Sequence, residues 1–237
     1  FGTRVPFFVA SGLALFGFFL SLIVLKVPKK HVINQMDFPK ESILGILKIS
    51  FFSSLFIIIL VSSFGLQAFE SIYSIMATIN FGFTTNDIAL VITISGSLAL
   101  ICQVFLFDWI VSKLSEMRLI QLTFFVSATF IAVIAFTTSH LVVVLSTFVV
   151  FLSFDLFRPA VTTYLSKNGG NQQGAINGLN STFTSFGNIL GPLAAGSLFD
   201  LNHFYPYYVS AMILLGTKFL SLFLSNKKKK KLLLKKS

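Results

Sequence analysis

The residues of this 237-residue sequence that could exchange protons are charged side chains inside long apolar stretches. They are Glu70, Asp155 and Arg158, with Lys218 in the last apolar stretch. An Asp, Lys or Arg at the centre of a membrane helix costs about 2.5 to 3.5 kcal/mol on insertion scales. Such residues therefore face protein or water, and they are candidates for proton exchange or ion pairing. A buried pair that only holds helices together remains the alternative, and Lys218 is expected to extend its ammonium toward the membrane surface.

Asp155 and Arg158 are three residues apart, which places them on one face of a helix. Pro159 lacks the amide that would bond the carbonyl of Asp155, so we expect a kink or a local opening there. Glu70 has no cation near it in the sequence. An opposite charge favours the ionised form of a carboxyl, whereas burial disfavours it. We therefore predict that Glu70 is the main proton-exchanging group, and that Asp155 is mostly ionised or paired.

A second informative stretch, residues 174–196, combines glycine with small polar residues. Two glycine pairs of small-xxx-small spacing, Gly174 with Gly178 and Gly187 with Gly191, predict close helix approach. Steps of three and four residues place one set of polar side chains on a single side of the helix. This set comprises Asn177, Asn180, Ser181, Thr184 and Asn188. The sequence leaves open whether they bond neighbouring helices or line a cavity.

Other kinds of chemistry lack the residues that they need. The histidines, His31, His140 and His203, are far apart, and Cys102 is the single cysteine. We therefore expect no metal site, no disulfide framework and no cofactor. We also find no nucleophile beside a base, so an enzyme is not expected.

Composition indicates an all-α integral membrane protein. Hydrophobic residues make up 55% of the chain and charged residues only 11%, whereas soluble domains carry about 25% charged residues. The formal net charge of +10 does not indicate nucleic acid, because the basic residues cluster beside apolar stretches. These clusters are the lysines of residues 26–48 and the polylysine run at the end, which predict contact with anionic lipid headgroups.

A helix needs about 20 apolar residues to cross a bilayer. We predict seven such spans, at residues 5–25, 49–77, 87–107, 119–138, 141–165, 176–198 and 205–225. Basic and non-basic connections alternate along the chain, so the basic side is predicted to be cytoplasmic. The first residue is then outside the cell and the carboxyl terminus is inside, in the plasma membrane.

The long polar connection after the first span divides the chain. We expect residues 1–25 to be the last helix of a missing N-terminal bundle and 26–48 to be the cytoplasmic linker between bundles. Residues 49–225 are expected to form a six-helix bundle, followed by a cytoplasmic tail at 226–237. The bundle divides into 49–138 and 141–225, two three-helix repeats of inverted topology. Secondary transporters use such repeats to build a site near the bilayer midplane.

Two runs in the second half of the chain closely resemble the last helices of NorA/Bmr-type multidrug efflux proteins, which are drug:proton antiporters of the major facilitator superfamily. These runs are FDLFRPAVTTYLS and NQQGAINGLNSTFTSFGNILGPLAAGSLFD. The segment that begins FGLQAFESIYS resembles the seventh and eighth helices, and FGTRVPFFVASGLALFGFFLS resembles the sixth. The resemblance covers nearly the whole chain, but only the carboxyl-terminal half of a twelve-helix transporter.

The resemblance implies export of lipophilic, often cationic, compounds in exchange for protons. It matches Glu70, Asp155 and Arg158 to proton coupling and Asn188 to drug contact. Beside these we expect further substrate-binding residues, namely Asn180, Ser181, Thr184, Gln67, Phe69 and Phe154. The sequence departs from the family pattern in the loop of residues 107–118. Ser112 and Ser115 stand where an acid and a glycine are common, whereas the charged residues Lys113, Glu116 and Arg118 are kept.

Two other functions fit the span pattern. One is a proton-coupled importer of a small solute on the same fold. The other is a seven-helix receptor or photoreceptor with Lys218 as the retinal-binding lysine, although the third span contains no carboxylate from Ile88 to Phe107. The expected partners are thus small hydrophobic or cationic molecules, protons, lipid and the missing half-bundle.

Overall fold

A computed structural model of the protein describes residues 4–24 and 43–234. The chain divides into two compact units, Phe1–Glu41 and Ser42–Ser237, and the first contains one described helix, α1 (Val5–Val24). Most of the predicted linker falls on residues 25–42, outside the described residues, as do the last three residues of the predicted tail.

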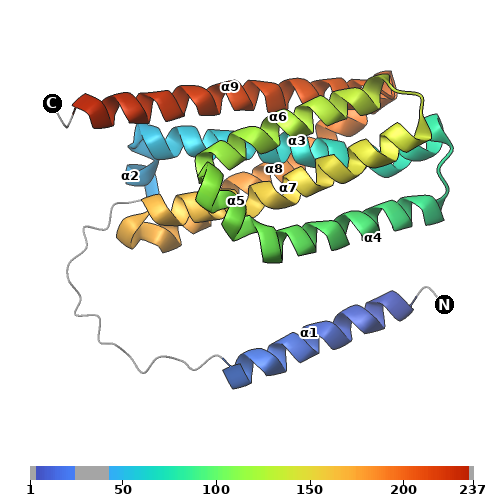
Figure 1. Cartoon of the computed structure of the whole chain (residues 1–237), viewed down its shortest axis with the longest axis horizontal. Coiled ribbons are helices and arrows are strands. Elements are labelled where there is room, and N and C mark those ends of the chain that lie inside the picture. Colours follow the sequence, from blue (N-terminus) through green and yellow to red (C-terminus); the bar gives the residue numbers. More distant parts are fainter. Residues whose placement is uncertain (1–3, 25–42, 235–237) are drawn as a thin grey trace. The chain divides into compact units, whose positions relative to one another are not determined.

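The second unit is a helical bundle (Figure 1). Its elements in chain order are α2 (Ile43–Lys48), α3 (Ser50–Phe81), α4 (Thr85–Ile101), the π-helical turn η1 (Cys102–Leu106), α5 (Phe107–Leu114), α6 (Glu116–Phe136), α7 (His140–Asn168), the 3-10 turn η2 (Gly170–Gln172), α8 (Gln173–Leu201) and α9 (Tyr205–Leu234). Each predicted span therefore coincides with a long helix. The structure adds α2 inside the predicted linker and continues α9 beyond residue 225.

The described residues form an all-helical membrane protein without strands. Five helical segments are long and apolar enough to cross a membrane, namely Phe7–Val24, Phe51–Phe81, Thr85–Leu114, Glu116–Phe136 and His140–Asn168. Helix α8 is less apolar, because it contains asparagine, serine and threonine side chains. The membrane class is thus confirmed, while a count of seven spans stays a prediction.

Contacts within the bundle are symmetric between the two halves. The main pairs are α3 with α8, α4 with α7, and α6 with α9, and α6 also packs on α7 as α3 does on α9. Exchanging α3 with α7, α4 with α8 and α6 with α9 turns each of these contacting pairs into a pair of the same set. Such a pattern is the one that a two-fold axis between two three-helix repeats would generate.

The closest helix pair is α3 with α8, and glycine makes this contact possible. A Cβ atom on Gly187 would lie 2.6 Å from Ser63 Cβ and 2.7 Å from the backbone nitrogen of Phe64. One on Gly191 would lie 2.8 Å from the carbonyl oxygen of Phe64. This glycine pair therefore brings the two backbones together as predicted. The pair Gly174 and Gly178 does not, since a Cβ atom at either position meets nothing within 4 Å.

Local sequence sets the other helix ends. At one end of the bundle Gly82 ends α3 in the left-handed conformation, and Thr84 begins α4 with a capping box that includes Asp87. Proline does not break α7 or α8, because both helices continue through Pro159 and Pro192. The kink or local opening expected at Pro159 stays a prediction.

The connection before α6 differs from the expected loop. Helical structure continues from α4 through η1 and α5 to Leu114, so that only Ser115 separates α5 from α6. Ser115 has φ 62° and ψ 154°, a backbone conformation that is found almost entirely at glycine. The serine that replaces the family's usual glycine therefore keeps a conformation that suits glycine.

We expect Ser115→Gly to stabilise the protein by about 1 kcal/mol, because glycine adopts this conformation without steric strain. Thermal unfolding of the purified protein should show a midpoint about 2–4 °C higher. Ser112→Gly is the matched control, since Ser112 lies inside α5 and glycine weakens a helix. Equal losses of stability in both variants would contradict the strain at Ser115.

We expect Gly187→Ala to destabilise the bundle by about 1–3 kcal/mol, because the new methyl group overlaps the backbone of α3. Gly178→Ala provides the control, as its methyl group meets open space and alanine favours the helix. Thermal unfolding measures both. A midpoint for Gly187→Ala at or above that of the unmodified protein would show that α3 and α8 are not in close contact.

Candidate functional site

A cavity of about 360 Å³ lies between α3, α7 and α8. Each helix contributes residues at steps of three and four, so each presents one face to the cavity. The polar lining consists of Ser63 and Gln67 from α3, Arg158 and Thr162 from α7, and Asn180, Ser181, Thr184, Ser185 and Asn188 from α8. The apolar lining consists of Ile59, Leu66, Phe157 and Val161. The cavity can therefore hold an amphipathic molecule and offer it hydrogen bonds.

The close contact between α3 and α8 determines the shape of this cavity. Gly191 packs against Gln67, because a Cβ atom on Gly191 would lie 3.1 Å from Gln67 Cβ. Gly187 precedes Asn188, whose side chain lines the cavity and is exposed. In one turn of α8, Gly187 therefore packs against α3 while Asn188 presents its amide to the cavity.

Arg158 is the single charged residue of the lining. Its Nη2 atom lies 4.0 Å from Oε2 of Glu70 on α3. Both side chains are partly exposed, at 64% for Arg158 and 43% for Glu70, so solvent weakens this contact. Glu70 has no cation near it in the sequence, but in the fold α7 supplies one across the helix interface.

Asp155 lies on α7 one turn before Arg158 and is half-buried. Arg158 is close enough to act on it electrostatically, although no ion pair within 4.0 Å joins the two in the described part of the chain. Neither Asp155 nor Glu70 contributes to the cavity lining. The structure thus places one arginine at the cavity and two carboxylates close to that arginine, on α3 and α7.

The predicted aromatic contacts lie elsewhere. Phe69 is fully buried and Phe154 is 5% exposed, and both belong to the hydrophobic core. Their ring centroids are 5.9 Å apart in an edge-to-face arrangement, and Phe69 also packs against Tyr207 of α9. The aromatic ring that lines the cavity is that of Phe157. The structure therefore places Phe69 and Phe154 in helix packing rather than at the cavity.

Some lining residues were absent from the sequence prediction. Ser63 lies one turn before Gln67, and Thr162 lies one turn after Arg158. Helical spacing from those two predicted residues was the available signal. Ile59, Leu66 and Val161 carried no such signal, since any apolar residue of a membrane helix looks alike in the sequence.

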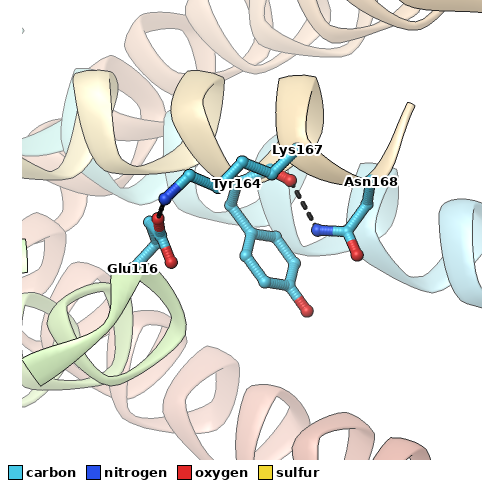
Figure 2. Close-up of polar contacts among 4 residues, drawn as sticks. All are labelled: Glu116, Tyr164, Lys167 and Asn168. Carbon is cyan, nitrogen blue, oxygen red and sulfur yellow. Dashed lines mark hydrogen bonds and ion pairs between the residues drawn. The ribbon is translucent and has the colours of Figure 1, made fainter. Parts of the chain in front are cut away.

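A second charge pair joins α6 and α7 away from the cavity. Lys167, near the end of α7, donates to Oε1 of Glu116 at the start of α6, as Figure 2 shows. The Glu116 side chain is largely buried, at 12% exposed. In the same turn of α7, the Asn168 amide donates to the carbonyl oxygen of Tyr164 at 2.7 Å. This ion pair joins the start of α6 to the end of α7.

Comparison with known proteins gives the chain a family. The sequence model of the Major Facilitator Superfamily matches residues 1–192 and, in a second placement, residues 55–236. Multidrug resistance protein 2 of Bacillus subtilis (strain 168) is 42% identical over 223 residues, which cover 91% of this chain and 55% of that protein. Multidrug resistance protein 1 of the same organism is 41% identical, with 90% of this chain and 54% of that protein covered.

Quinolone resistance protein NorA of Staphylococcus aureus is 35% identical over 207 residues, covering 87% of this chain and 53% of that protein. The chain therefore spans about half the length of the curated relatives that it matches. The family match favours a transporter over a catalyst and over a seven-helix receptor. By the length of this match and the identity of these relatives, the chain belongs to the Major Facilitator Superfamily.

Proposed function

We propose that this chain forms half of a proton-coupled multidrug exporter, which exchanges lipophilic and often cationic compounds for protons. The observation that carries the proposal is a polar cavity whose one arginine lies near two carboxylates. The names of the relatives, multidrug and quinolone resistance proteins, support the substrate class. A cavity that mixes amides, hydroxyls and apolar side chains suits compounds of varied structure.

A charge count explains how a proton and a cation would compete. With both carboxylates ionised, Glu70, Asp155 and Arg158 carry a net charge of −1, which attracts a monovalent cation. One proton on either carboxylate makes the cluster neutral and removes this attraction. Both carboxylates interact with the same arginine, Arg158, so in this proposal the proton belongs to the cluster rather than to Glu70 alone.

The cavity needs a second bundle to close it. Asn188 and Ser181 line the cavity and are exposed, and polar groups left in lipid cost several kcal/mol each when unsatisfied. Alternating access also requires two bundles that rock around a shared site. The missing N-terminal half-bundle of the same protein is the partner that fits, because the relatives are about twice as long as this chain.

The finer topology belongs to the same proposal. We take α3, α4 with α5, and α6 as one repeat and α7, α8 and α9 as its inverted counterpart, an arrangement supported by the symmetric helix contacts. Lys113, Arg118 and Lys167 lie at one end of the bundle, where Glu116 joins α6 to α7. The short connections at 82–84 and 137–139 contain no basic residue. By the positive-inside rule the basic end faces the cytoplasm, with the chain start outside and the carboxyl terminus inside.

We expect Glu70→Gln to reduce proton-driven export of a fluorescent lipophilic cation at least tenfold, because the cluster then lacks its net negative charge. Export is measured in vesicles from cells that express this chain together with the N-terminal half-bundle, as dye accumulation driven by a pH gradient. Asp200→Asn is the matched control, since this exposed carboxylate ends α8 far along the chain from the cluster. A protonophore should abolish transport in the unmodified protein.

Asp155→Asn distinguishes the two carboxylates. If Glu70→Gln retains export driven by pH while Asp155→Asn loses it, Asp155 alone exchanges the proton, which contradicts a proton shared by the cluster. If both variants retain coupled export, the cluster does not carry the proton. Dye uptake that proceeds with the proton instead of against it would indicate the importer.

A further inference from the structure

The surface formed by α6 and α9 contains an open groove of about 670 Å³. Phe125, Ala132 and Phe136 of α6 line it together with Leu215 of α9, and its surface is mainly apolar. The rings of Phe136 and Tyr208 meet at one end of this helix pair, with centroids 5.3 Å apart. Figure 1 shows α9 running beside α6, whereas the drug cavity lies between α3, α7 and α8.

A lysine lies at the other end of this groove. The Nζ atom of Lys218 is 3.7 Å from the centroid of the Phe125 ring, an attractive cation–π contact. No carboxylate neutralises this charge. The segment Tyr205–Leu234 contains no Asp or Glu, and the one acid of α6, Glu116, is paired with Lys167. Within the described residues Lys218 forms no ion pair.

Two further donors continue from Lys218 toward the start of α6. Gln121 lies one turn before Phe125, and its Nε2 atom is buried without a hydrogen-bond partner. Arg118 lies two turns before Phe125, is exposed and forms no ion pair with any described residue. The spacing 118, 121 and 125 places all three side chains on one face of α6. Two cations, neither of them in an ion pair with a described residue, therefore lie near one end of an apolar groove, where they would attract an anion.

The length of the groove fits one leaflet of a bilayer. From Phe125 to Thr137 the helix rises about 18 Å at 1.5 Å per residue. One leaflet contributes about 15 Å of hydrocarbon, half of the 30 Å core. Arg118 lies seven residues, about 10 Å of helix rise, before Phe125. With its headgroup at Arg118, an acyl chain that spans one leaflet therefore reaches the near end of the groove, beside Phe125, Ala128 and Thr129.

We propose that the surface between α6 and α9 is a binding site for an anionic phospholipid, with the phosphate held by Arg118 and Lys218 and an acyl chain packed along α6 into the near end of the groove, at Phe125 and Thr129. Lys218 turns from the Phe125 ring toward the phosphate. Basic pockets between membrane helices are known places for acidic headgroups. This site is separate from the drug cavity, and it does not depend on the transport proposal.

The test compares two lipids with identical acyl chains on the purified 237-residue protein in detergent. The probes are phosphatidylglycerol, which is anionic, and phosphatidylcholine, which is zwitterionic. Lipid affinity is read by native mass spectrometry and by the rise of the unfolding midpoint with lipid concentration. We expect at least tenfold tighter binding of phosphatidylglycerol. Lys218→Met and Arg118→Gln should each weaken its binding about fivefold.

Two more variants separate this site from general surface charge. Lys113→Met removes an exposed cation of α5 near the same end of the bundle, and it should leave the affinity unchanged. Thr129→Phe fills the groove from an exposed position, and it should weaken the binding of phosphatidylglycerol. Equal binding of the two lipids, or an equal loss in Lys113→Met and Lys218→Met, would overturn the site. Unchanged affinity in Thr129→Phe would show that the groove does not hold the acyl chain, which also overturns it.

Discussion

The backbone contact between α3 and α8 is the constraint on which the candidate site depends. Membrane helices gain little from burying apolar side chains against each other, because lipid is equally apolar, so close packing of small residues supplies the attraction. Gly187 and Gly191 allow this packing, and they leave no room for a methyl group. The contact positions Gln67 of α3 opposite the amide and hydroxyl side chains of α8. Without it the polar face of α8 would have no opposing wall.

The charges near the cavity come from one arginine and two carboxylates. Arg158 on the cavity wall would by itself repel the cations that we propose as substrates. Glu70 on α3 and Asp155 on α7 offset this charge, and in the proposed exchange either a proton or a cation takes up the surplus negative charge. In that proposal the arginine reduces the charge of the two carboxylates to a single unit.

Helical periodicity explains how much of this could be read from the sequence. It predicted the long helices and the polar face of α8, since both are properties of one segment. It could not show that Arg158 approaches Glu70, because these residues are 88 positions apart and meet only when α7 packs beside α3. Phe69 was predicted because it is next to Glu70 in the sequence, but neighbours on a helix point about 100° apart, and Phe69 turns into the core while Glu70 is exposed. Ser115 shows a third limit, because only backbone angles reveal that a serine occupies a glycine conformation.

The bundle has two kinds of surface, and each handles charge in its own way. On the cavity side, charges from different helices lie close enough to offset one another, so the net charge can change with one proton. On the α6 and α9 side, Lys218 lies over the Phe125 ring and forms no ion pair with a described carboxylate. A permanent cation at an apolar surface persists where its environment supplies the anion. In a membrane that anion is a lipid headgroup, and this is why an isolated lysine on the outer face and a paired arginine at the cavity are both consistent with one stable fold.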